Sequence, residues 1–163
     1  MEKNKAVQPR IAYGKVSPEG VAILGTLENY LKGCGLDPGL LELVKLRSSQ
    51  INGCAFCIDM HTKDARSRGE SEQRLYALSA WRETPFYTAR ERAALEWTEA
   101  VTKVSDHQVP DEIYELVKPH FTEKELVDLT LAVIAINAWN RLAISFRTPA
   151  GSYKPSHPVT RVG

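Results

Sequence analysis

The hydrophobic positions of this chain recur every three or four residues, the spacing of helices that bury one face. The first such stretch opens at Ser17-Pro18, where an N-cap residue followed by proline favours a helix start. Asp37-Pro38 repeats this signal, and Asn52-Gly53 breaks the second stretch. A third helix is predicted from about Cys54 to Arg68.

Two later helices begin at capping boxes, in which a threonine hydroxyl and a glutamate side chain satisfy free backbone N–H groups. These boxes are Thr88 with Glu91 and Thr122 with Glu125. The second box opens the longest helix, to about Phe146, and shorter helices are predicted within 71–84 and 110–117. The chain has no convincing strand alternation and no G-x-G-x-x-G motif. We therefore predict an all-α bundle of about six to seven helices.

Irregular segments flank a single predicted helical domain at 17–148. Residues 1–16 lack periodicity and are predicted to form an extended arm, while prolines and glycines at 149–163 indicate an irregular tail. The longest helix is apolar nearly all round its axis, and such a helix needs cover on every side. We expect part of it to lie in a subunit interface; the alternative is a central helix buried within one chain.

Composition and charge narrow the possible partners. The net charge is +1, which gives no electrostatic basis for binding nucleic acid or an anionic membrane. The longest apolar run, Leu129 to Ile136, is shorter than the roughly 18 residues that span a bilayer. No secretory signal pattern opens the chain, and three cysteines are too few for a secreted disulfide scaffold. We expect a cytoplasmic protein.

The segment from Cys54 to His61 carries the candidate chemistry. Cys54 and Cys57 are three residues apart, and His61 follows Cys57 by four, so one helix face presents all three side chains. A thiolate attacks peroxides and disulfides, and a helix N-terminus or a neighbouring base favours that form. His61 can accept the Cys57 proton near neutral pH. This spacing predicts a reactive pair that cycles between thiols and a disulfide.

Glu42 lies one helix earlier and can approach His61 if the chain folds back at Asn52-Gly53. A carboxylate there would orient the imidazole and raise its basicity. Taken alone, Glu42 also reads as a surface acid that pairs with Lys45. For the cysteines, the competing interpretations are a zinc site formed with His61 and Glu42, or two inert buried side chains. Cys34 reads as a small residue at a helix end.

These residues resemble the core motif of the AhpD-like alkylhydroperoxidases, in the carboxymuconolactone decarboxylase family. That motif is a glutamate, eleven intervening residues and then C-x-x-C-x-x-x-H, and the chain has it without a gap. The matching residues are Glu42, Cys54, Cys57 and His61, and the segments 46–54 and 138–142 are also similar.

The resemblance implies an all-helical fold, a homo-oligomer (trimer or hexamer) and no metal or organic cofactor. It also implies that Cys57 attacks the peroxide, that Cys54 is proton donor and disulfide partner, and that His61 and Glu42 relay protons. The expected partners are a small hydroperoxide and a dithiol or protein reductant.

The chain departs from the better-studied AhpD proteins at Phe56, where those proteins carry a relay histidine. A shorter proton relay is therefore expected. The same family includes decarboxylases that act on a lactone acid without a cofactor and lack this cysteine pair, which leaves cofactor-free decarboxylation as an alternative function.

Overall fold

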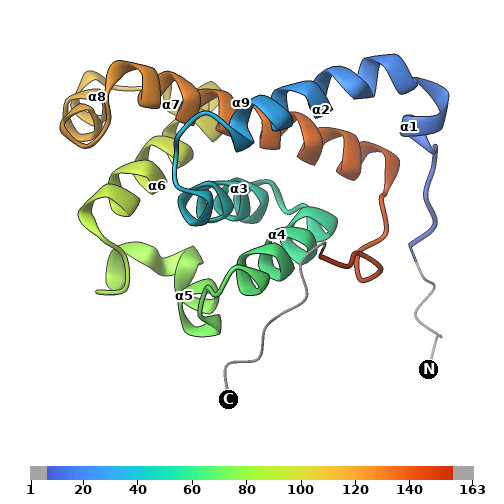
Figure 1. Cartoon of the computed structure of the whole chain (residues 1–163), viewed down its shortest axis with the longest axis horizontal. Coiled ribbons are helices and arrows are strands. Elements are labelled where there is room, and N and C mark those ends of the chain that lie inside the picture. The colour runs from blue at the N-terminus through green and yellow to red at the C-terminus, as the bar shows by residue number, and fades with distance from the viewer. Residues whose placement is uncertain (1–6, 156–163) are drawn as a thin grey trace.

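The structure is a computed structural model that describes residues 7–155 (Figure 1). This range holds nine α-helices and two short 3-10 helices, and no strand. The α-helices are α1 (Tyr13–Val16), α2 (Pro18–Lys32), α3 (Pro38–Asn52), α4 (Ala55–Ser67), α5 (Glu72–Ala77), α6 (Ala89–Thr102), α7 (Val104–His107), α8 (Asp111–Val117) and α9 (Glu123–Phe146), and the 3-10 helices are η1 (Leu78–Glu83) and η2 (Lys118–His120). The all-α class is confirmed.

The helix count exceeds the six to seven that we predicted. Two of the nine, α1 and α7, are four-residue turns, which are too short to produce a periodic apolar stripe. The α1 turn also falls within the segment predicted to be an extended arm. Contacts with the end of α9 hold it: the Arg10 N–H donates to the Phe146 carbonyl at 2.9 Å, and the Tyr13 and Phe146 rings pack 5.8 Å apart.

The helix starts read from the sequence match the structure. Both threonine capping boxes are formed, and the side chains of Asp37 and Ser71 each accept a hydrogen bond from a backbone N–H in the first turn of their helices. In the predicted tail, residues 149–155 contain no helix. The remainder of the predicted tail, 156–163, and residues 1–6 of the predicted arm lie outside the described residues.

Helix α3 lies at the centre of the bundle. It packs against α4, α6 and α9, and both of its sides are buried, including Leu43, Val44 and Leu46. Figure 1 shows α2 and α9 along one side of the molecule, with α3 and α4 beneath them. The chain reverses direction at Gly53, so that α4 packs back against α3. These two helices together form one side of the candidate site.

Helix α9 is long and apolar enough to cross a membrane by length and composition alone, with a mean hydropathy of 1.4 over its most apolar window. It packs instead against α2, α3 and α6 and buries the polar residues Asp128 and Asn140, as core helices do. The interpretation that it is buried entirely within one chain does not hold, because Val127 and Ile134 are 59% and 50% exposed.

A buried polar network joins the end of α3 to α9. The Asn52 side-chain amide donates to the Asn137 and Asn140 side-chain oxygens at 3.0 and 2.8 Å. The Asn140 amide donates in turn to Ser49 Oγ at 3.0 Å, and that hydroxyl donates to the Lys45 carbonyl at 2.8 Å. The network fixes the last turn of α3, which leads into Gly53 and Cys54.

Replacing Ser49 with alanine should destabilise the fold by roughly 1–3 kcal/mol, because the buried Asn140 amide loses its acceptor. Ser105→Ala is the matched control: Ser105 is exposed, and its loss should change stability by less than about 0.5 kcal/mol. Urea unfolding of both variants measures the difference. Equal midpoints would show that the network does not hold α3 on α9.

Candidate active site

The two cysteines stand at the start of α4 because of the turn that precedes them. Gly53 has φ 69°, a left-handed conformation that glycine adopts without strain. The N–H of Cys54 donates to the Ser49 carbonyl at 3.0 Å, which closes the end of α3. Cys54 is the N-cap of α4, and its sulfur accepts from the Cys57 N–H at 3.4 Å.

Cys54 and Cys57 form a disulfide, with their Cα atoms 5.4 Å apart. That separation lies within the usual range for the bond. Both residues are 1% exposed, but their surroundings differ. The two cysteines pack in one apolar cluster with Ile136 and Ala143, and of the two only Cys57 also lines a cavity. The pair is thus asymmetric: only one of the two residues borders a space that a small molecule could enter.

His61 and Glu42 form a buried hydrogen bond beside this pair, with 2.9 Å between Nδ1 and Oε2. The two residues are 5% and 9% exposed. Because an ionised carboxylate only accepts, Nδ1 carries the hydrogen, and in the neutral form of the imidazole Nε2 has a free lone pair. Glu42 is not the surface acid of the competing interpretation. Lys45, its expected partner there, pairs with Glu28 at 2.5 Å.

The electrostatics keep Glu42 ionised. Burial acts to raise the pKa of Glu42, but the hydrogen bond and charge of His61, with further charge from Lys45 and Arg68, outweigh it. The net result is a pKa below the ordinary 4.5. Arg68 Nε lies 3.9 Å from Glu42 Oε1, farther than His61 Nδ1 at 2.9 Å. At neutral pH the imidazole therefore faces a full negative charge on its Nδ1 side.

The cavity next to Cys57 has a volume of about 500 Å³. One part of its wall is apolar, from Phe56, Met60, Trp139 and Ala143. The rest is polar or charged, from Tyr13, Glu28, Lys32, Glu42, Lys45, His61, Asp64, Ser67, Arg68 and Tyr153. A mixed wall of this kind suits a small organic molecule with one polar end.

Asp64 and Tyr153 are among the cavity residues that were missed from the sequence. Asp64 had a usable signal, because Cys57, His61 and Asp64 follow at helical spacing and share a face of α4. Tyr153 had none, since it lies 89 residues from its partner Asp64. Of the neighbouring residues Trp139 and Asn140, only Trp139 lines the cavity, and Asn140 belongs to the buried network.

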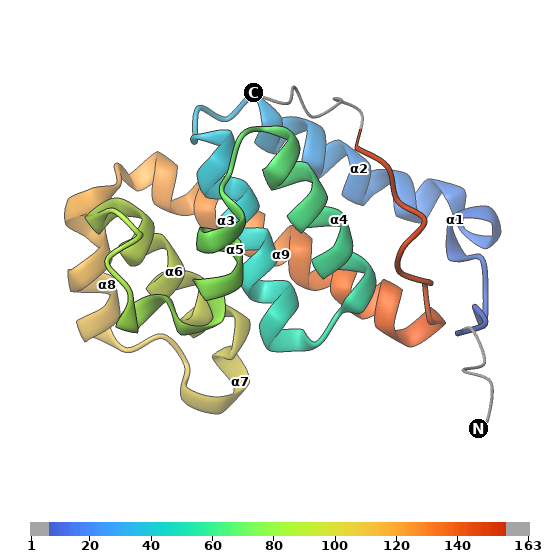
Figure 2. The same cartoon turned by 90° about the horizontal axis from the view of Figure 1, so that it is seen from below.

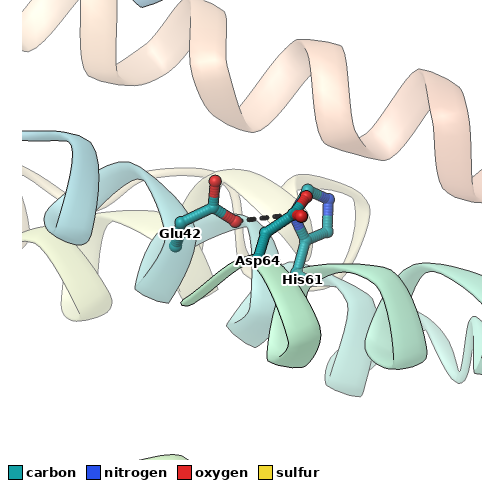
Figure 3. A group of neighbouring side chains, drawn as sticks. All are labelled: Glu42, His61 and Asp64. Atoms are coloured by element: carbon teal, nitrogen blue, oxygen red, sulfur yellow. Dashed lines mark hydrogen bonds and ion pairs between the residues drawn. The ribbon is translucent and has the colours of Figure 1, made fainter. Parts of the chain in front are cut away.

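Glu42, His61 and Asp64 each offer one ligand atom within 4.8 Å of the others, which is the arrangement drawn in Figure 3. Hydrogen-bond donors already compensate the two carboxylates: Glu42 accepts from His61, and Asp64 accepts from the Tyr153 hydroxyl. The alternative zinc set is not assembled in this state, because both its sulfurs are joined in the disulfide.

These features define an all-helical protein with a C-x-x-C disulfide beside a buried histidine–glutamate pair. The chain belongs to the carboxymuconolactone decarboxylase family, whose model matches residues 18–100. The predicted family is confirmed. Among its relatives, the uncharacterized protein YdfG of Bacillus subtilis is 48% identical over 88% of this chain and 97% of its own. The uncharacterized protein YnjA of Escherichia coli is 32% identical over 78% of this chain and 68% of its own.

Solved structures agree with this assignment. ATU0492 of Agrobacterium tumefaciens, a protein of unknown function proposed to act in antioxidant defence as an AhpD protein, superposes with a TM-score of 0.86. It is 46% identical, and the match covers 90% of this chain and all of that one. The debrominase Bmp8 has a TM-score of 0.76 over 85% of this chain and 74% of its own, at 17% identity. That similarity concerns the fold alone.

The pH dependence of stability tests the Glu42–His61 hydrogen bond. Since the folded-state pKa of Glu42 is lowered, its ionised form stabilises the fold above the ordinary pKa of 4.5, and this contribution is lost as pH falls through the lowered value. Glu42→Gln should cost roughly 1–3 kcal/mol at pH 7. The gap to the wild type should shrink below about pH 4.

Urea unfolding at pH 7, 5 and 3 measures this gap, with the exposed Glu83→Gln as control. A gap that stays constant across the series, or one that widens toward pH 3, would contradict a lowered pKa for Glu42.

Proposed function

We propose that this protein is a thiol-dependent peroxidase that reduces small organic hydroperoxides in antioxidant defence. In this proposal Cys57 is the attacking sulfur and Cys54 its disulfide partner, while His61 and Glu42 relay protons. One observation carries the proposal: Cys57, but not Cys54, lines the cavity that also contains the hydrogen-bonded His61–Glu42 pair.

The oxidation step begins with both cysteines reduced. His61 Nε2 takes the Cys57 proton, and the thiolate forms in the first turn of α4, where the helix dipole favours negative charge. The thiolate attacks the terminal oxygen of the hydroperoxide and the O–O bond breaks. The Cys54 thiol protonates the departing alkoxide, which leaves as an alcohol, and Cys57 becomes a sulfenic acid.

The disulfide then closes. The Cys54 thiolate attacks the Cys57 sulfur, the S–O bond breaks, and the hydroxide takes the proton held by His61 and leaves as water. The two electrons that reduce the peroxide thus come from the two thiols. Glu42 stabilises the imidazolium between the two steps, as the carboxylate of a catalytic triad does.

An external thiol must restore the reduced pair. Cys57 borders the cavity and Cys54 does not, so the incoming thiolate meets Cys57 first. Attack on the Cys57 sulfur gives a mixed disulfide and releases Cys54 as a thiolate, next to the Cys57 N–H that already donates to it. A dithiol or a protein reductant then resolves the mixed disulfide.

Phe56 makes the relay shorter than in the better-studied AhpD proteins. It occupies the position of their extra histidine and contributes an apolar side chain to the cavity. Proton transfer then depends on His61 and Glu42 without a further imidazole, and the apolar wall favours an organic hydroperoxide. ATU0492 supports an antioxidant function, since it is similar over its whole length. Cofactor-free decarboxylation would leave the cysteine pair without a use.

We also propose a homo-oligomer, a trimer or hexamer. The support is the exposed apolar surface of α9 at Val127, Ile134 and Ile144, which no other part of the described chain covers. Sedimentation equilibrium of the purified protein tests this, and a monomer at micromolar concentration would contradict it. A cytoplasmic location, where reducing thiols are abundant, stays a prediction.

Peroxide consumption with a dithiol reductant tests the proposed function. Cys57→Ser should abolish turnover of a linear alkyl hydroperoxide, because no thiolate remains at the cavity. Cys34→Ser is the matched control: the same substitution at the free, half-buried cysteine outside the site should leave turnover within about twofold. Full activity in Cys57→Ser, or no turnover in the wild type with any dithiol, would contradict the proposal.

A further inference from the structure

The segment after α9 turns back and runs along α4, and we call residues 149–155 the strap. Figure 2 shows it in dark red beside α4. The Gly151 N–H donates to Asp59 Oδ2 at 3.1 Å, and Lys63 Nζ donates to the Tyr153 carbonyl at 3.1 Å. Lys63 also pairs with Asp59 at 2.8 Å. Two side chains one turn apart on α4 thus hold the main chain of the strap.

Tyr153 adds a third attachment, inside the cavity. Its hydroxyl donates to both carboxylate oxygens of Asp64, at 2.8 and 3.0 Å. Burial, with the hydrogen bond and charge of Asp64, raises the pKa of Tyr153 to about 12. The hydroxyl therefore stays protonated at neutral pH and remains a donor. The attachment holds the Tyr153 side chain as part of the cavity wall.

We propose that Tyr153 is a specificity-determining residue, which restricts access to Cys57 to slender molecules and excludes bulky ones. This proposal rests on the proposed function in one respect: it takes hydroperoxides as the molecules that Tyr153 admits or excludes. Helix α4 supplies Cys57 and also the strap's three attachment points, Asp59, Lys63 and Asp64. The wall at Tyr153 therefore has a fixed position relative to the sulfur.

The volume and the lining of the cavity indicate which molecules can pass Tyr153. The volume of about 500 Å³ lies within the range of small-molecule sites. Its apolar side chains, Phe56, Met60 and Trp139, suit a hydrocarbon body. The favoured ligand is a hydroperoxide with a narrow apolar chain, whose O–O group lies at Cys57. A branched or fused-ring hydroperoxide would clash with Tyr153.

Alkylation of Cys57 by two maleimides of different width tests the proposal without requiring any peroxidase activity. The full chain with Cys34→Ser and Cys54→Ser leaves Cys57 as the sole thiol. Tyr153→Ala in this background should raise the rate with N-(1-pyrenyl)maleimide by about tenfold or more, and that with N-ethylmaleimide by less than about threefold. Tyr153→Phe, which keeps the ring but loses the Asp64 attachment, should give a smaller increase in the same direction.

Tyr76→Phe is the matched control, because the Tyr76 hydroxyl also donates to a carboxylate, that of Glu72 at 2.9 Å, but Tyr76 does not line the cavity. Both of its rates should equal those of the background protein. Thermal unfolding of every variant shows that the fold persists. If Tyr153→Ala changes both maleimide rates by the same factor, or changes neither, Tyr153 does not select by width.

Peroxide turnover separates this proposal from the proposed function. In the chain with native cysteines, Tyr153→Ala should raise kcat/KM for cumene hydroperoxide relative to that for hydrogen peroxide. If the wild type consumes no peroxide but the maleimide rates diverge as expected, the peroxidase proposal fails and the access role of Tyr153 stands. If turnover occurs and the selectivity ratio is unchanged, the role of Tyr153 fails alone.

Discussion

The hydrogen bond between Glu42 and His61 is the interaction on which the candidate site depends. It joins two consecutive helices, α3 and α4, across the reversal at Gly53, and it is almost fully buried. Burying a carboxylate is costly unless partners compensate it. Here His61, Lys45 and Arg68 supply that compensation. A fold that keeps such a pair fixes one tautomer of the imidazole and leaves the other ring nitrogen free for chemistry.

The rest of the molecule keeps this pair in place. The asparagine–serine network holds the end of α3 on α9, and the turn at Gly53 then sets the start of α4 against the same helix. Cys54 and Cys57 consequently pack in one apolar cluster, and of the two only Cys57 borders the cavity. The same backbone geometry thus gives two equally buried, chemically identical side chains different positions relative to the cavity.

Local patterns in the sequence predicted the helices. They did not predict the contacts between residues that are far apart in the chain. The capping boxes at Thr88 and Thr122 and the spacing of Cys57 and His61 depend on residues within one or two turns, so both could be read directly. The partner of Glu42 could not be decided that way, because Lys45 is much closer to it in sequence than His61, 19 residues away, yet Lys45 pairs with Glu28 from α2. Tyr153 reaches Asp64 only through the tertiary fold.

The most direct test of the account is the pH dependence of Cys57 alkylation by iodoacetamide, in reduced protein whose other cysteines are serine. The account predicts half-maximal reaction well below the pH of about 8.5 expected for a free cysteine. It also predicts that replacing His61 with glutamine moves the midpoint upward. A midpoint at or above that of free cysteine, unchanged by loss of the imidazole, would contradict it.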